Sequence, residues 1–184
     1  MQIVAGEGFS GWHALNDTVM GGRSQGQVKV SSMQGLLFDG DLIEQGGGFI
    51  SVRSPQFSPP LNLEGFTGLQ LLIAGEGRRF KLAVACADGL GGLSELIPGG
   101  VRWVQEFSTE ADGHTTVKVP FSALQASVRA KPLQRPFGFE PRFDPSRITR
   151  LQILHSKFDD QGGLNQGFRP GLIHLELASI EAMP

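Results

Sequence analysis

The serine in "VMGGRSQGQV", residues 19–28, has a spacing that serine hydrolases use. Residues 22–26 read G-x-S-x-G, the pattern of a nucleophile elbow, in which a strand precedes the serine and a helix follows it. The residues after Ser24, "QVKVSS", instead alternate like a strand. Because the helix is missing, we predict that Ser24 hydrogen-bonds local backbone in a glycine-rich turn and is not a nucleophile. The sequence therefore predicts no catalytic residue and a protein that is not an enzyme.

Histidines and carboxylates are the other residues that could do chemistry. The four histidines share no spacing that signals a metal site, although three of them could still meet in space: His13, His114, His155 and His174. Four aspartates lie among turn residues, where a carboxylate can bond its own backbone: Asp39, Asp41, Asp159 and Asp160. A structural calcium ion at such turns is the alternative. We predict no metal and no cofactor.

Arginines are clustered in two places. In "GEGRRF", residues 75–80, a lone G-x-G without a following helix does not predict a dinucleotide loop. We expect a tight turn there that places Arg78 and Arg79 at the start of a strand, and Arg79 is a predicted binding residue.

The second cluster is the segment 129–147, "RAKPLQRPFGFEPRFDPSR", which has a local charge of +3 and four prolines that prevent regular pairing. Its length predicts an ordered functional loop. The predicted binding residues in it are Arg135, Phe137, Phe139 and Arg142. Three interpretations stay open: stacking of single-stranded RNA bases, docking of an acidic protein surface, or phenylalanines that simply fold inward.

The net charge of the whole chain argues against a general nucleic-acid-binding protein. It has 184 residues, a formal net charge of -2 and a pI near 6.1, so it lacks the strong positive charge of general nucleic-acid binders. The length predicts one domain over residues 1–184. With neither a leader peptide pattern nor a long apolar run, we expect a soluble cytoplasmic protein without a transmembrane segment.

Short alternating segments predict the fold. The 26 glycines and 11 prolines interrupt the chain too often for long helices. In "RRFKLAVAC" apolar side chains recur at every second residue, as in a strand with one face on a core. About nine strands are expected, near residues 26–32, 36–43, 47–54, 68–74, 78–86, 101–107, 115–121, 148–156 and 172–180. The prediction is an all-β antiparallel sandwich or jelly roll, with one or two helical turns within 120–128.

The stretch "WHALNDTVMGGRSQGQV" resembles the opening motif W-x-x-x-N-D-x-V-M-G-G-x-S of the complex I intermediate-associated protein 30 family. Later stretches follow in the order of that family, including "GGGFISVRS", "VRWVQEF" and "FDPSRITRLQI". The resemblance implies a galactose-binding-like β-sandwich. It also implies a non-enzymatic assembly or biogenesis factor, whose partners are protein subunits of a respiratory or photosynthetic membrane complex or its assembly intermediate. A carbohydrate-binding module, or an RNA-binding factor using 129–147, is the alternative function.

The resemblance also assigns roles to residues of the motif. It implies that Gly21 and Gly22 adopt positive φ in a turn and that Trp12 and Met20 pack. Asn16, Asp17 and Arg53 are polar where packing would not require polarity, so they are predicted to form a binding surface. The alternative is an internal Asp17–Arg53 ion pair that fixes the turn.

Overall fold

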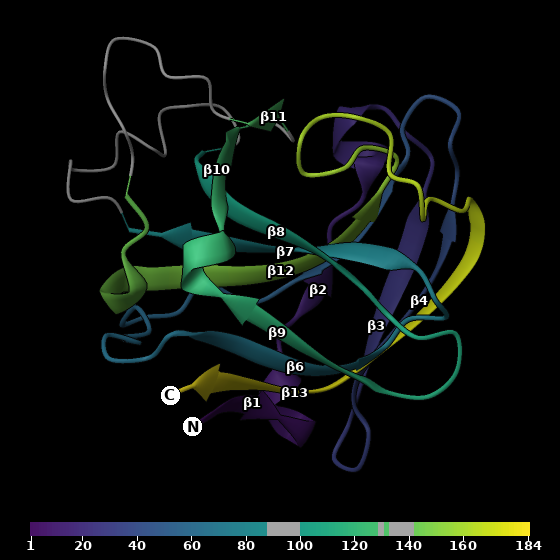
Figure 1. Cartoon of the computed structure of the whole chain (residues 1–184). Helices are drawn as coiled ribbons and strands as arrows, with labels where there is room; N and C mark the ends of the chain where they lie inside the picture. The colour runs from purple at the N-terminus through teal and green to yellow at the C-terminus, as the bar shows by residue number, and fades with distance from the viewer. Residues whose placement is uncertain (88–99, 129–130, 133–141) are drawn as a thin grey trace, which may run out of the picture.

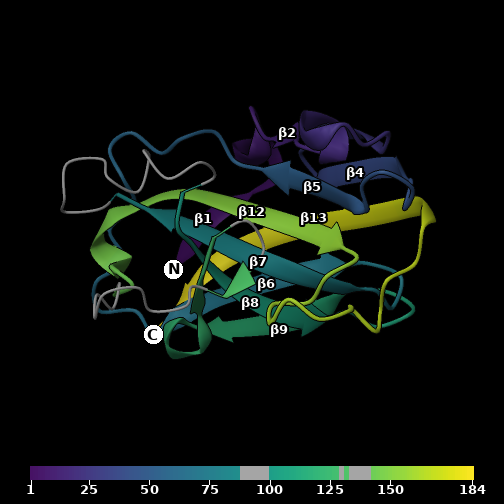
Figure 2. The ribbon, with the colours of Figure 1, turned by 90° about the horizontal axis from the view of Figure 1, so that it is seen from above.

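The computed structural model describes residues 1–87, 100–128, 131–132 and 142–184, with the backbone alone at 131–132. Two antiparallel sheets pack face to face, with β8, β7 and β12 above β6, β13 and β1 in Figure 1. The six-stranded sheet has the order β3-β4-β13-β6-β9, and β1 also pairs with β13. The seven-stranded sheet has the order β11-β10-β8-β7-β12-β5-β2, and Figure 2 shows β5, β12, β7 and β8 side by side. The predicted all-β sandwich is confirmed.

The nine predicted strands are all present. They are β3 (Gln25–Ser31), β4 (Gly35–Leu42), β5 (Phe49–Arg53), β6 (Gly68–Ala74), β7 (Arg79–Cys86), β8 (Arg102–Ser108), β9 (Thr115–Pro120), β12 (Ile148–Ser156) and β13 (Gly171–Met183). Four short strands were not predicted: β1 (Gln2–Ala5), β2 (His13–Ala14), β10 (Gln125–Val128) and β11 (Lys131–Pro132). The 3₁₀ turns are η1 (Gly6–Phe9), η2 (Asp17–Met20), η3 (Phe121–Ala123) and η4 (Pro145–Arg147).

The core lies between the two sheets, and β13 shows how the sequence keeps it continuous. Leu175 and Leu177 are buried, and so are Ile180 and Ala182. The first two positions are odd-numbered and the last two are even-numbered, so a regular strand would place the two pairs on opposite faces. The pairing of β13 with β6 shifts register between Leu177 and Ser179. Such a bulge adds one residue and turns the following side chains to the other face. The shift therefore returns the apolar side chains of the second half of β13 to the core.

Two expectations for the region after β9 were partly wrong. The helical part of 120–128 is limited to η3, and Gln125–Val128 forms β10, which pairs with β8. The segment 129–147 was expected to have no strand pairing, but β11 pairs with β10 through Lys131 and Pro132. Proline is tolerated there because β11 is the edge strand of its sheet.

Candidate functional site

A buried carboxylate organises the turn that carries the N-D-x-V-M-G-G motif. Asp17 is 1% exposed. Its Oδ1 accepts the Ser24 N–H (2.9 Å), while Oδ2 accepts the Ser24 hydroxyl (2.7 Å) and the Gly48 N–H (2.8 Å). Burial alone would raise the pKa of the Asp17 carboxyl, but the hydrogen bonds from Gly48, Ser24 and Phe49 outweigh it and lower the pKa. Asp17 thus joins three chain segments from inside the protein.

Glycines allow these segments to come so close. A Cβ at Gly22 would lie 2.3 Å from Cγ of Asp17, and one at Gly47 would lie 2.1 Å from its Oδ2. Gly21 has φ +87° and open space around its Cβ position. The expected positive φ is therefore confirmed for Gly21 and wrong for Gly22, where glycine is needed because the Asp17 side chain occupies the space.

The polar residues of the motif face inward. Ser24 is fully buried, and its hydroxyl also accepts the Ile43 N–H at 2.9 Å. Asn16 is 9% exposed, and its Oδ1 accepts the Ser51 N–H at 3.3 Å. The alternative of an internal Asp17–Arg53 ion pair is wrong, because none of the ion pairs between described residues joins these two.

The apolar residues of the motif differ sharply in exposure. Trp12 is 6% exposed and meets Phe9 edge-on, with the ring centroids 5.3 Å apart. Val19 and Met20, in η2, are 64% and 77% exposed. The expected packing is confirmed for Trp12 and wrong for Met20. The network around Asp17 thus presents two neighbouring apolar side chains to solvent.

A second candidate surface is the face of the seven-stranded sheet turned away from the six-stranded sheet, called the outer face below. In β7 the side chains of Phe80, Leu82 and Val84 enter the core, so Ala83 and Ala85 lie on the outer face. Both alanines are nevertheless buried. Since alanine is short, longer side chains on β8 and β12 leave a pocket above Ala83.

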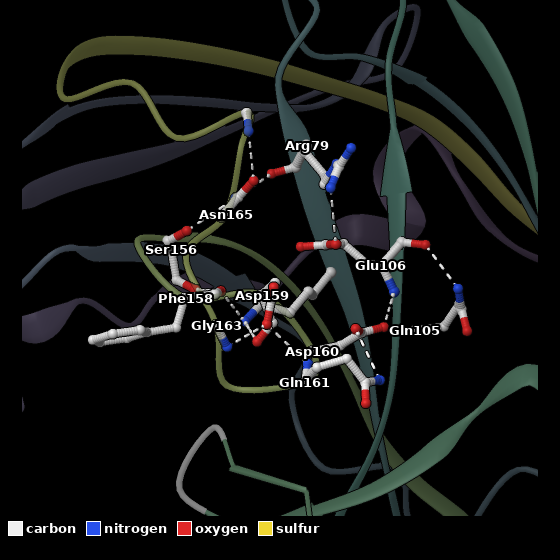
Figure 3. Close-up of polar contacts among 12 residues, drawn as sticks. Arg79, Gln105, Glu106, Ser156, Phe158, Asp159, Asp160, Gln161, Gly163 and Asn165 are labelled. Atoms are coloured by element: carbon white, nitrogen blue, oxygen red, sulfur yellow. Dashed lines mark hydrogen bonds and ion pairs between the residues drawn. The ribbon is translucent and has the colours of Figure 1, made fainter.

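The loop 157–165 packs against β7 and β8 on the outer face (Figure 3). The buried Lys81 donates from Nζ to the carbonyls of Phe158 and Asp159. Asp160 Oδ2 accepts the backbone N–H of Glu106 at 3.3 Å, as Figure 3 shows. The carboxylate of Asp159 accepts N–H groups of its own loop, from Gln161 and Gly163. The predicted turn role of Asp159 is confirmed.

Glu106 lies where this loop meets the sheet. Arg79 approaches it with 3.4 Å between Nη1 and Oε2 (Figure 3). Burial and then the charge of Asp160 raise the pKa of the Glu106 carboxyl, although Arg79 and Lys81 oppose them. Arg79 begins β7, as predicted, and its carbonyl accepts the Nδ1–H of His155 at 2.7 Å. Arg79 therefore connects β7 to β8 through Glu106, to β12 through His155 and to the loop 157–165 through Asn165.

The pocket above Ala83 has a volume of about 110 Å³ and lies beside this loop. It is lined by Lys81, Ala83, Arg102, Val104, Ser127, Gln152, Leu154, Asp159 and Asp160. Its volume is below the roughly 300–1,000 Å³ of pockets that enclose a drug-sized ligand. The pocket can therefore receive part of a ligand, with amide, hydroxyl and charged groups around an apolar floor.

Two arginines lie on the outer face next to the pocket. Arg53 of β5 is opposite Gln152 of β12, and Arg150 is two residues earlier on β12. Burial, followed by the charge of Arg150, lowers the pKa of Arg53. The Nε of Arg53 is buried and has no hydrogen-bond partner. Arg53 was a predicted binding residue, whereas Arg150 was missed, since only strand pairing brings the two together.

The basic segment is described in part. Arg135, Phe137 and Phe139 lie outside the described residues, so the structure does not test their predicted binding role. Arg142 is exposed. Phe143 packs inward, with ring centroids 4.9 Å from Phe121 and 5.6 Å from Trp103. At Phe143 the structure agrees with the interpretation in which the phenylalanines fold inward.

No helix within the described ranges has the length and apolar character needed to cross a membrane. No three histidine, cysteine or carboxylate side chains of that part of the chain lie where they could hold a metal ion together.

Solved structures with the same fold are found at low sequence identity. A family 11 carbohydrate-binding module from Clostridium thermocellum in complex with a β-1,3-1,4-mixed-linked tetrasaccharide is 14% identical, with a TM-score of 0.58, covering 99% of this chain and 94% of that one. The family 11 module of the cellulase Lic26A-Cel5E from the same organism is 14% identical, with a TM-score of 0.60 and coverage of 100% and 93%. An agarase is 8% identical over 95% of this chain and 23% of its own, with a TM-score of 0.56. These likenesses support the galactose-binding-like sandwich.

Sequence comparison identifies the family. A search of curated protein sequences gave no match. The family description "Complex I intermediate-associated protein 30 (CIA30)" matches residues 1–177. The match includes the turn built around Asp17, the outer face and the strands of both sheets up to the middle of β13. The chain therefore belongs to the complex I intermediate-associated protein 30 family.

Proposed function

We propose that this protein is a non-catalytic binding module that assists the assembly of a multisubunit membrane complex, respiratory or photosynthetic, through protein–protein contacts. Family membership over residues 1–177 supports a role linked to complex I. The observation that carries the proposal is the exposure of Val19 and Met20 on a turn anchored by Asp17.

The energetics of docking favour such a turn. Large apolar side chains at the centre of an interface commonly supply much of the binding energy. A turn held by several hydrogen bonds to one buried carboxylate loses little conformational freedom when a partner binds. Val19 and Met20 are therefore the predicted anchors for a subunit of the complex or for its assembly intermediate.

The test is affinity purification from the source organism in mild detergent, with the bound proteins identified by mass spectrometry. Wild-type protein should enrich subunits of one membrane complex, and the double variant Val19→Asp/Met20→Asp should lose them. Met33→Asp is the matched control, because Met33 is 93% exposed in the turn between β3 and β4. Equal recovery with the double variant, or no subunit of a membrane complex with wild type, would contradict the proposal.

A second candidate function is carbohydrate binding, favoured by the pocket on the outer face. One similar structure carries a bound mixed-linked tetrasaccharide, and this pocket is lined by Ala83 and by Gln152, whose side-chain amide donates to the Ser51 hydroxyl at 2.9 Å. The sequence contains no tyrosine, while Trp12 is buried and Trp103 packs against the core. Binding at the described part of this face would therefore depend on hydrogen bonds more than on aromatic stacking. Calorimetric titration with the same tetrasaccharide, using wild type and Gln152→Ala, tests it.

A further inference from the structure

Arg53 and Arg150 form a pair of positive charges on the outer face. Arg150 donates to two neutral groups, the Ser54 carbonyl (3.2 Å) and the Gln56 side chain (3.4 Å). The Nε of Arg53 is buried without a hydrogen bond. Within the described ranges, no ion pair links either guanidinium to a carboxylate. Two adjacent cations therefore share one patch of the sheet.

This arrangement is costly in the unliganded protein. A buried donor without an acceptor loses its hydration without compensation, and the cost is greater when the group is charged. An oxyanion would supply acceptors for both planar guanidiniums, whose forked geometry suits carboxylate, sulfate and phosphate. The pair thus has the chemistry of an anion site.

The pair lies beside Gln152, a residue that lines the pocket. Gln152 lines the pocket and lies opposite both Arg53 on one neighbouring strand and Ala83 on the other. Arg150 lies opposite Ala85, which is the next residue of β7 after Ala83 that faces outward. A ligand that reaches from the pocket floor toward β5 therefore meets Gln152 first and the guanidiniums next.

The position on a sheet face selects the kind of ligand. An extended peptide gains much of its affinity from backbone pairing at a sheet edge, whereas the face of a sheet offers side chains. Side-chain amides and guanidiniums suit a ligand with many hydroxyl groups of its own. We infer that the outer face binds an acidic saccharide, with its carboxylate or sulfate against Arg53 and Arg150 and a neutral part of a sugar ring at Ala83. This inference rests on the second candidate function.

The test compares acidic and neutral probes by isothermal titration calorimetry on the full chain. The probes are tetragalacturonate, a sulfated heparin tetrasaccharide, the neutral mixed-linked tetrasaccharide, inorganic sulfate and hexaglutamate. At least one acidic saccharide should bind ten times more tightly than the neutral one. Arg53→Gln and Arg150→Gln should each remove most of this preference. Arg23→Gln is the matched control, because Arg23 is bonded to Gln45 in another part of the protein.

The outcomes separate the inference from the function on which it rests. Equal binding of acidic and neutral saccharides, unaffected by the arginine variants, would overturn the inference and leave sugar binding in place. Absence of binding by every saccharide would overturn both. Equally tight binding of hexaglutamate or sulfate would replace the saccharide with an acidic peptide or a free anion. If circular dichroism shows that Arg53→Gln is unfolded, Arg53→Lys, which retains the charge, and Arg150→Gln carry the test.

Discussion

The carboxylate of Asp17 accepts both polar hydrogens of Ser24, the backbone N–H at 2.9 Å and the hydroxyl at 2.7 Å. The same side chain accepts the Gly48 N–H, so one buried charge joins η2 to the starts of β3 and β5. The G-x-S-x-G spacing thus belongs to a structural turn.

Asp17→Asn should destabilise the protein by about 3 kcal/mol or more, since a charged acceptor is lost and buried donors lose a partner. For a chain of this length that corresponds to a fall in Tm of roughly 6–12 °C. Urea unfolding followed by circular dichroism measures the change. Ser24→Ala should cost less, because the backbone N–H remains. A loss below about 1 kcal/mol in Asp17→Asn would show that the network contributes little.

Substitution of the neighbouring glycines by alanine should destabilise the protein by different amounts. Gly21→Ala should cost about 1–2 kcal/mol, because only the left-handed backbone opposes the new methyl group. Gly22→Ala and Gly47→Ala should cost more, since each added Cβ overlaps the Asp17 side chain. Thermal unfolding of the three variants ranks them. A larger loss in Gly21→Ala than in the other two would contradict this explanation.

His155 should make the protein sensitive to mild acid. Burial lowers the pKa of His155 to about 4, despite the hydrogen bond to the Arg79 carbonyl, and the charges of Arg78, Arg169 and Lys81 add to the effect. Because the unfolded chain takes up this proton near pH 6.5, the contribution of His155 is present above that pH. It is lost as pH falls toward 4, by up to about 3 kcal/mol.

The His155→Gln variant isolates this effect. Its free energy of unfolding, measured by urea titration at several pH values, should change less than that of wild type between pH 6.5 and 4. The ring of His155 also stacks on Phe168, with centroids 5.6 Å apart, so the variant should be less stable at pH 8. Equal pH slopes in the two proteins would refute the assignment to His155.

Lys81 should control the mobility of the loop 157–165. In Lys81→Met the carbonyls of Phe158 and Asp159 lose their cationic donor, at a cost of about 1–3 kcal/mol. Hydrogen exchange at amides of this loop should accelerate at least tenfold, while amides in β13 keep their rates. Unchanged exchange in the loop would mean that the bonds of Asp159 and Asp160 alone hold it.

Alternation of apolar residues was sufficient to predict every long strand, because one face of each strand lies on the core. The short strands β1 and β2 were missed, since two to four residues cannot show a period. β10 and β11 were missed because strand pairing, of β10 with β8 and of β11 with β10, defines them more than their own composition.

Prediction of the candidate site was less complete. The motif pointed to the right turn, but its polar residues were expected at the surface and its methionine inside. Hydrogen bonds from Gly48 and Ser24 instead hold the Asp17 side chain inside the protein. No local sequence pattern encodes such a contact between residues 31 positions apart. The proximity of Arg53 to Arg150 likewise depends on strand order. Only the register of β5 against β12 brings these arginines together.

Strand β5 links the two candidate surfaces over a short distance. Its first residue, Phe49, donates a long hydrogen bond to Asp17, and its last, Arg53, lies on the outer face. Four residues of strand span only about 13 Å. A protein interface of ordinary size buries about 800 Å² on each partner, and we expect a partner docked on Val19 and Met20 to reach Arg53. The protein partner and an acidic ligand should then exclude one another, so that each acts as a competitive displacer of the other.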